Sequence, residues 1–234
     1  MTKKERAALA AELLEKEYPE VKCSLNYSNP LEMLIATQLS AQCTDARVNI
    51  VTEELFKRYK TARDYAGADI EELQDYIRSA GFYKNKSKNI IACCKRLVEV
   101  YGGEVPDTME DLLTLAGTGR KTANLVLGDI FGKPAVVVDT HCIRLSNRIG
   151  LTSSREPEKI EQELKKLVPP EKQLGLCHRF VYHGRAVCTA RSPKCTECSV
   201  RPACKMTGVD KKFTEQPQKA EKKKTEKKKT EKKG

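Results

Sequence analysis

The sequence lacks any long apolar run and contains few aromatic side chains. It has no Trp, only 6% aromatic residues and three His among its 234 residues. No apolar stretch approaches the roughly 20 residues that a membrane-spanning helix requires, which excludes an integral membrane protein. The first residues after Met1 are basic, but the segment from Ala10 to Lys16 provides no apolar signal core. We therefore expect a cytoplasmic protein with no membrane contact.

Strand signals are also scarce. The one strand-like run, Ala135 to Val138, has no second run to pair with, and one strand makes no sheet. Helix signals are frequent, among them a capping box from Thr2 to Glu5 and a helix start at Asn29-Pro30. Gly81 ends a helix that begins at Asp69. Further helices are predicted over about 44–56, 86–101, 107–115, 120–131, 140–149, 156–168 and 171–186. The predicted fold class is all-α.

The positive charge is concentrated at the C-terminal end. The chain has a formal net charge of +11, and residues 211–234 contain eleven Lys and four Glu, which is +7 of that total. This stretch repeats lysine-rich units and carries no apolar stripe, so we expect a disordered lysine-rich tail over 211–234. Two interpretations stay open: a solubilising tail, or a mobile polycation that attracts DNA or RNA phosphates.

A turn with two glycines lies between two predicted helices. Gly117 and Gly119 precede Arg120 and Lys121, and backbone N–H groups of such a turn beside a helix N-terminus favour an anion such as a phosphodiester. Taken alone, the pattern is also typical of an ordinary tight helix–helix turn. It is not a nucleotide P-loop, because the spacing before Lys121 is too short and no strand precedes it.

Four cysteines occur within 17 residues near the end of the helical region. A span this short, rich in basic residues and Pro, needs a cross-link to fold, and disulfides are unfavourable in a cytosolic chain. A bound metal is therefore predicted, and the spacing alone leaves zinc and an iron–sulfur cluster as alternatives. The other six cysteines and the three His are interpreted as structural. The proposed ligands are Cys188, Cys195, Cys198 and Cys204.

Together these segments resemble the helix–hairpin–helix DNA glycosylases, and within them the endonuclease III branch. The resemblance extends from about Tyr18 to Val209. It rests on four motifs in the family's order: Leu39-Ser-Ala-Gln42-Cys-Thr-Asp45, Gly117-Thr-Gly-Arg-Lys121-Thr-Ala-Asn124, Val138-Asp139-Thr140-His141, and the x6, x2, x5 spacing of the four cysteines. The hairpin departs from the family at Ala116, where Pro is usual, and at Thr118, where a branched apolar residue is usual, which predicts a less rigid hairpin.

The resemblance implies base-excision repair of double-stranded DNA that carries a damaged base or an abasic site. Lys121 would be the nucleophile that forms a Schiff base with the sugar, and Asp139 its carboxylate partner. The implied enzyme is a bifunctional DNA glycosylase and AP lyase that removes oxidised or ring-saturated pyrimidines and then cleaves the strand by β-elimination. The expected protein is a monomer associated with the nucleoid.

The resemblance also implies the remaining parts of the site. The cysteine spacing is the one this family uses for one 4Fe–4S cluster. Gln42 would fill the space left by an extruded base, with Phe82 as an apolar wedge beside it. The other implied DNA-binding residues are Gly117, Gly119, Arg120, Arg191 and Lys194, with Arg201 and Lys205 as further phosphate contacts.

The implied architecture is two helical domains with the catalytic cleft between them. Residues 23–134 would form a six-helix domain with the hairpin, and residues 1–22 would join 135–210 in a domain with the cluster loop. Three alternatives to the proposed activity remain: an adenine-mismatch glycosylase, a non-catalytic DNA-binding or redox-sensing protein, and a zinc-dependent DNA-binding module. Lys121 argues against the first, because glycosylases of this fold that only remove a base lack it.

Overall fold

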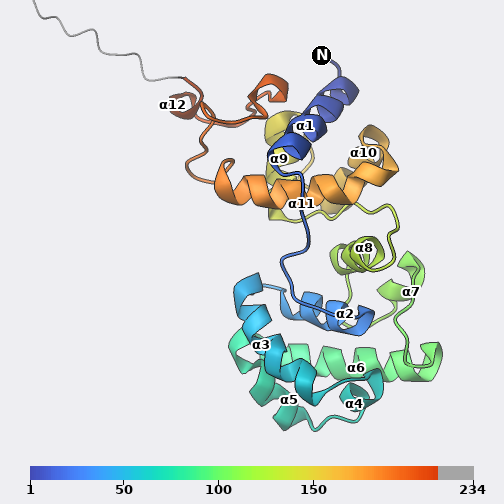
Figure 1. The fold of residues 1–234 in the computed structure, drawn as a ribbon. Helices are drawn as coiled ribbons and strands as arrows, with labels where there is room; N and C mark the ends of the chain where they lie inside the picture. The colour runs from blue at the N-terminus through green and yellow to red at the C-terminus, as the bar shows by residue number, and fades with distance from the viewer. Residues whose placement is uncertain (216–234) are drawn as a thin grey trace, which may run out of the picture.

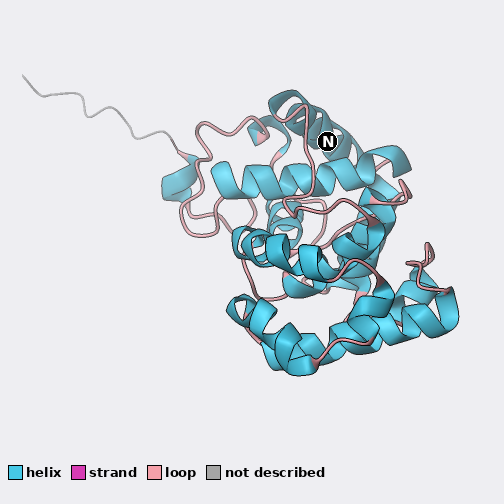
Figure 2. Cartoon of the chain, turned by 60° about the horizontal axis from the view of Figure 1, so that its bottom comes forward, coloured by secondary structure: helices cyan, strands magenta, loops and turns pink. Residues whose placement is uncertain are grey.

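The computed structural model describes residues 1–215, and this part of the chain consists of helices joined by loops (Figures 1 and 2). Within it no strand forms, and the run from Ala135 to Val138 is a loop whose first three residues are buried. The predicted all-α fold class is therefore confirmed. Residues 216–234, which include most of the predicted lysine-rich tail, lie outside the described residues. No helix in residues 1–215 is long and apolar enough to cross a membrane.

One group of helices is formed by the middle of the chain and occupies the lower part of Figure 1. The long α6 packs against α2, α4 and α5, while α8 packs against α2 and α7. The members of this group are α2 (Pro30–Leu39), α3 (Asp45–Arg58), α4 (Ala62–Ala66), α5 (Ile70–Ile77), the 3-10 helix η1 (Arg78–Ala80), α6 (Tyr83–Tyr101), α7 (Met109–Leu113) and α8 (Arg120–Asp129).

The second group unites the first helix with the last third of the chain, in the upper part of Figure 1. Helix α1 packs against α10, α11 and η2, and α11 also packs against α9. The chain therefore passes between the two groups twice, before α2 and after α8. The members of this group are α1 (Lys3–Glu17), α9 (Thr140–Ile149), α10 (Pro157–Leu167), α11 (Pro170–Ala186), η2 (Arg201–Ala203) and α12 (Lys211–Thr214).

Local capping explains where these helices begin and end. The Thr2 hydroxyl accepts from the backbone N–H of Glu5 at 3.2 Å, and the Glu5 carboxylate accepts from the backbone N–H of Thr2 at 2.8 Å, which confirms the capping box. Asn29 caps α2 with Pro30 at its first position. Helix α6 ends at Gly102, whose φ of 65° is the left-handed conformation that glycine adopts without strain.

The structure differs from the sequence predictions at three elements. The helix predicted from Asp69 to Gly81 ends at Ile77 and continues as the 3-10 helix η1. The five-residue α4 was not predicted, because its apolar pattern is too short to show a period. Helix α12 occupies the start of the segment predicted to be disordered, because Asp210 caps it and Arg201 donates a 2.8 Å hydrogen bond to the Thr214 carbonyl.

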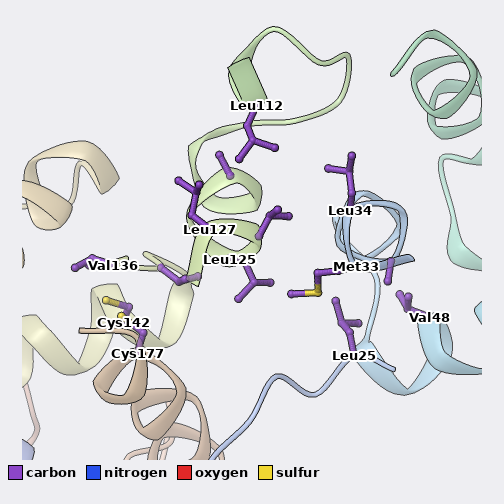
Figure 3. Packing of buried hydrophobic residues seen from close by; sticks show 14 of the residues in the cluster. Leu25, Met33, Leu34, Val48, Leu112, Leu125, Leu127, Val136, Cys142 and Cys177 are labelled. Carbon is purple, nitrogen blue, oxygen red and sulfur yellow. The ribbon is translucent and has the colours of Figure 1, made fainter. Parts of the chain in front are cut away.

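The apolar core runs on both sides of α8. Figure 3 shows Met33 and Leu34 of α2 on one side of α8, Leu127 of α8 pointing to the opposite side, and Val136 beyond it. The buried thiols Cys142 of α9 and Cys177 of α11 continue the same cluster. Helix α8 is therefore the shared element between the two groups, and its first turn follows the hairpin and carries Lys121.

Candidate active site

A cleft of about 440 Å³ lies where the two groups of helices meet, and Lys121 and Asp139 both line it. Lys121 comes from α8 in one group, and Asp139 precedes α9 in the other. The remaining walls come from the segment before α2, from the loop after α2 and from α11. The structure therefore brings together the two residues that the sequence singled out for catalysis.

Lys121 is the second residue of α8, and its side chain is exposed in the cleft. Within residues 1–215, no carboxylate lies within 4.0 Å of its ammonium group. The Lys121 amine is therefore accessible to a substrate and is not held in an ion pair.

Asp139 is held by the helix that it caps. Its Oδ1 accepts from the backbone N–H of Cys142 at 2.7 Å, which satisfies one of the free donors at the start of α9. The side chain is half-buried and also lines the cleft. Helix capping and a place in the site are therefore compatible, because the cap fixes the carboxylate at the cleft wall.

His141 lies beside this carboxylate, where α9 and α11 make close contact. Its Nδ1 lies 3.1 Å from Nη2 of Arg144. Burial lowers the pKa of His141, which Asp139 opposes and Arg144 reinforces, so the imidazole is neutral at pH 7. The ring fits only because α11 has a glycine there: a Cβ on Gly184 would lie 2.4 Å from Nδ1 of His141.

The glycine turn forms the hairpin between α7 and α8. Gly117 has a φ of 74°, and a Cβ there would lie 3.0 Å from Cβ of Asn89, so both the backbone and the packing require glycine. Gly119 begins α8, and a Cβ built on it meets nothing within 4 Å. The N-terminal backbone of α8 therefore faces open space, as an incoming phosphate would require.

Gln38 supports this hairpin from the interior, a role that the sequence did not reveal. Its Nε2 donates to the Ala116 carbonyl at 3.1 Å and to the Thr118 hydroxyl at 3.3 Å. The hydroxyl at the unusual Thr118 therefore has a partner, although the side chain is buried. Gln38 belongs to an apolar helix face, where a polar residue is itself the signal that could have identified it.

Gln42 and Phe82 lie in two loops and share an unusual conformation. Both have positive φ, 54° and 50°, although neither is a glycine. Gln42 is exposed beside the cleft residues Ser40 and Cys43. Phe82 is 63% exposed, which for an aromatic side chain leaves a large apolar surface in water. Strained, exposed residues of this kind are typical of functional loops.

The structure places Arg120 away from this cleft. Its guanidinium binds Glu161 of α10 with two hydrogen bonds of 2.8 and 3.2 Å, and Glu161 also accepts from Lys165 at 2.7 Å. Burial raises the pKa of Glu161, but the hydrogen bonds from Arg120 and Lys165 outweigh it, and the net pKa is lowered. Arg120 therefore joins α8 to α10, and its predicted DNA contact would compete with a buried carboxylate.

Several cleft residues carried no signal in the sequence. Cys23, Cys43 and Cys177 come from three separate segments and line the same cleft. Arg185 of α11 donates to Asp45 at 2.7 Å, an ion pair that joins the two groups of helices at the cleft. These contacts depend on long-range packing, and none of the cysteines has the spacing of a metal site.

The four C-terminal cysteines line one apolar cavity with Val187, Pro193 and Val209. Within residues 1–215, no three His, Cys, Asp or Glu side chains converge closely enough to hold a single ion. Two sulfurs have polar neighbours: Arg148 Nη1 donates to Cys188 Sγ at 3.4 Å, and His183 Nε2 lies 3.2 Å from Cys198 Sγ. Four cysteines around one cavity, with polar groups beside their sulfurs, fit a group larger than one ion.

The basic residues of this loop fall into two classes. Arg191 and Lys194 are exposed, as a phosphate contact requires. Arg201 instead donates to the carbonyls of Cys195 and Thr214, at 3.2 and 2.8 Å, and so holds the loop together. Lys205 is exposed, but its stem packs against Gly150. The predicted phosphate role therefore fits Arg191 and Lys194 better than Arg201.

Comparison with known proteins gives one consistent result. Residues 35–170 match the model of the HhH-GPD superfamily base excision DNA repair proteins. The chain is 50% identical to endonuclease III of Synechocystis sp. over 204 residues, which is 87% of this chain and 93% of that protein. It is 46% identical to endonuclease III of Bacillus subtilis over 189 residues, 80% of this chain and 86% of that protein.

Solved structures agree with these relatives. A non-covalent endonuclease III–DNA complex superposes with a TM-score of 0.84 at 42% identity, covering 88% of this chain and 97% of that one. A trapped endonuclease III–DNA covalent intermediate superposes equally well, with a TM-score of 0.84. A thermostable thymine-DNA glycosylase shares the fold at 22% identity, with a TM-score of 0.77. The chain therefore belongs to the HhH-GPD superfamily of base excision DNA repair proteins, and within it to the endonuclease III family.

Proposed function

We propose that this protein is a bifunctional DNA glycosylase and AP lyase that removes oxidised or ring-saturated pyrimidines from double-stranded DNA. The observation that carries the proposal is the shared cleft of Lys121 and Asp139, which places an uncommitted amine and a fixed carboxylate around one space. The endonuclease III relatives, and the DNA complexes solved for that protein, support the same activity.

The chemistry follows from these two groups. The neutral Lys121 amine attacks C1′ of the extruded nucleotide, the glycosidic bond breaks, and the base leaves with a proton. The nitrogen then holds the opened sugar as a Schiff base. Loss of a proton from C2′ expels the 3′ phosphate by β-elimination. Asp139 stabilises positive charge at the sugar and takes part in these proton transfers.

The remaining predicted residues bind the DNA. The target nucleotide must leave the stack before Lys121 reaches its sugar, and Gln42 fills the vacated space with Phe82 as the apolar wedge. The backbone of Gly117 and Gly119 contacts the phosphodiester at the hairpin. Arg191 and Lys194 extend this contact through the cysteine loop.

We assign one 4Fe–4S cluster to the cavity formed by the four cysteines. Cys188, Cys195, Cys198 and Cys204 would hold it, and the apolar walls would keep water from the sulfurs. The cluster would cross-link a loop that lacks a core of its own. We give it no catalytic step, because the cysteines line a different cavity from the one that contains Lys121 and Asp139.

The whole-chain assignments follow from this activity. We propose a monomer with its catalytic cleft between residues 23–134 and the unit made of 1–22 and 135–210. A DNA substrate places it with the chromosome in the cytoplasm, associated with the nucleoid.

A duplex with one thymine glycol separates the two activities. The wild type should release the base and cut the strand, and Lys121→Ala should do neither while it still binds the duplex. Asp139→Asn should slow base release by about 100-fold or more, the size expected for loss of an acid–base group. Lys95→Met, on an exposed face of α6, is the matched control and should leave both activities unchanged.

Three results would contradict the proposal. Base release without strand cleavage by the wild type would favour a monofunctional glycosylase. Release of adenine from a mismatch would favour an adenine-mismatch glycosylase. Tight DNA binding without either reaction would favour a protein that only binds DNA.

A further inference from the structure

A buried lysine joins the two loops that carry Gln42 and Phe82. Lys86 lies on the first turn of α6 and is only 7% exposed. Its Nζ donates to the Leu39 carbonyl at 2.8 Å and to the Ala80 carbonyl at 2.9 Å. These carbonyls end α2 and η1, two elements that are 41 residues apart in sequence.

Both acceptor carbonyls lie at helix ends, where a cation is stabilising. The last carbonyls of a helix lack a partner inside the helix and form the negative end of its dipole. Lys86 therefore satisfies the ends of two elements with a single ammonium group. Within residues 1–215 it has no carboxylate partner, which is uncommon for a buried lysine.

The residues that follow the two acceptors are the proposed DNA-penetrating ones. Gln42 follows Leu39 by three residues, and Phe82 follows Ala80 by two. Only three non-glycine residues in the described part of the chain have positive φ, and Gln42 and Phe82 are two of them. Left-handed backbone at such residues is strained and persists only where the surroundings enforce it.

We infer that Lys86 is a positioning residue that fixes the two loops relative to each other, so that Gln42 and Phe82 enter the duplex together. This inference deepens the proposed function and rests on it. Lys86 itself touches no reacting atom. Its effect on the reaction passes through the placement of the two side chains, and a misplacement of about 1 Å can lower a rate about 100-fold.

The test measures base unstacking separately from chemistry. The duplex carries a tetrahydrofuran abasic analogue, which cannot form a Schiff base, opposite 2-aminopurine, whose fluorescence rises when it leaves the stack. Lys86→Met keeps the length of the side chain and removes its donors. Lys95→Met removes an exposed lysine from the same helix and is the matched control.

Lys86→Met should bind the duplex with unchanged affinity but lose most of the fluorescence rise, and single-turnover base release should fall about 100-fold. Lys95→Met should behave as the wild type. Gln42→Ala and Phe82→Ala should each have a smaller effect in the Lys86→Met background than in the wild type, because the loops are already misplaced.

A folded Lys86→Met protein with wild-type fluorescence and rate overturns the inference, and so do effects of Gln42→Ala and Phe82→Ala that add fully to it. If Lys86→Met unfolds, Lys86→Gln replaces it with the same criteria, since the amide can still satisfy one carbonyl but its shorter stem does not bridge both. A wild type that releases the base but leaves 2-aminopurine stacked overturns the joint entry of Gln42 and Phe82, and the role of Lys86 with it. A wild type that neither releases thymine glycol nor cuts the strand contradicts the proposed function itself.

Discussion

The lack of a Cβ at Gly184 leaves room for the imidazole of His141, which lies beside Asp139. Gly184→Ala would place a Cβ 2.4 Å from Nδ1 of His141, so the imidazole beside Asp139 must move. We expect base release to fall about 10-fold and stability to fall by about 1–3 kcal/mol, the range for overpacking. The measurements are single-turnover kinetics and thermal unfolding.

Gly175→Ala is the matched control for this change. It lies on the same helix, and its Cβ would meet only Nη1 of Arg179, the far end of a flexible side chain. If both variants lose the same activity and stability, the cause is a general intolerance of α11 to an added methyl group. The contact of residue 184 with His141 would then have no specific role.

Glu161 makes part of the stability depend on pH. Its folded pKa lies below the ordinary value of 4.5 because of Arg120 and Lys165. A lowered carboxyl pKa stabilises the fold above the unfolded pKa, and this contribution is lost as the pH falls through the folded value. Glu161→Gln should therefore destabilise the protein by about 2 kcal/mol at neutral pH and much less near about pH 3.

Melting temperatures of the wild type and Glu161→Gln at the two pH values check this sign. Glu158, which is exposed and 4.0 Å from Arg120, gives the control variant Glu158→Gln, which should change little. A difference between wild type and Glu161→Gln that grows as the pH falls would contradict the assignment.

At the scale of elements, the two glycines of the hairpin have different roles in stability and in DNA affinity. Gly117→Ala meets both a φ of 74° and a 3.0 Å contact with Asn89, so it should lower stability and DNA affinity together. Gly119→Ala meets open space and should lower DNA affinity while it lowers stability by less than about 1 kcal/mol, the difference between Gly and Ala at a helix N-cap. Fluorescence anisotropy and thermal unfolding of both variants test this; equal stability of the two would contradict it.

The elements also show why sequence reasoning succeeded only in part. Caps and glycine stops placed the ends of most helices, because these signals are local. Arg120 is predicted to bind DNA because it follows the hairpin glycines, and that role stays a prediction; its pairing with Glu161, 41 residues away, had no signal in the sequence. Gln38 and Gly184 act through tertiary contacts of the same kind, which no local pattern encodes.

At the scale of the whole molecule, the pairing of α1 with α10 and α11 could not be derived from periodicity. Amphipathic patterns show that a helix has a buried face, but they do not identify its partner. Only the family resemblance implied that the first residues join the last third of the chain. The cleft that this arrangement forms contains the predicted catalytic pair, Lys121 and Asp139.

The cysteine loop offers a test at this same scale. Cys198→Ser should lose bound iron and the yellow-brown colour, and its melting temperature should fall, because the loop then lacks its cross-link. Cys43→Ser, outside the four, should keep its iron. Iron and acid-labile sulfide analysis of the purified proteins decides the point. Zinc in place of iron would contradict the cluster assignment.

The central claim is that Lys121 attacks the sugar of the damaged nucleotide. Its most direct test is borohydride trapping on a duplex with one thymine glycol, followed by mapping of the modified peptide. We expect a covalent protein–DNA adduct on Lys121 that is absent from Lys121→Ala. An adduct on another residue, or none on this duplex or on one with an abasic site, would contradict it.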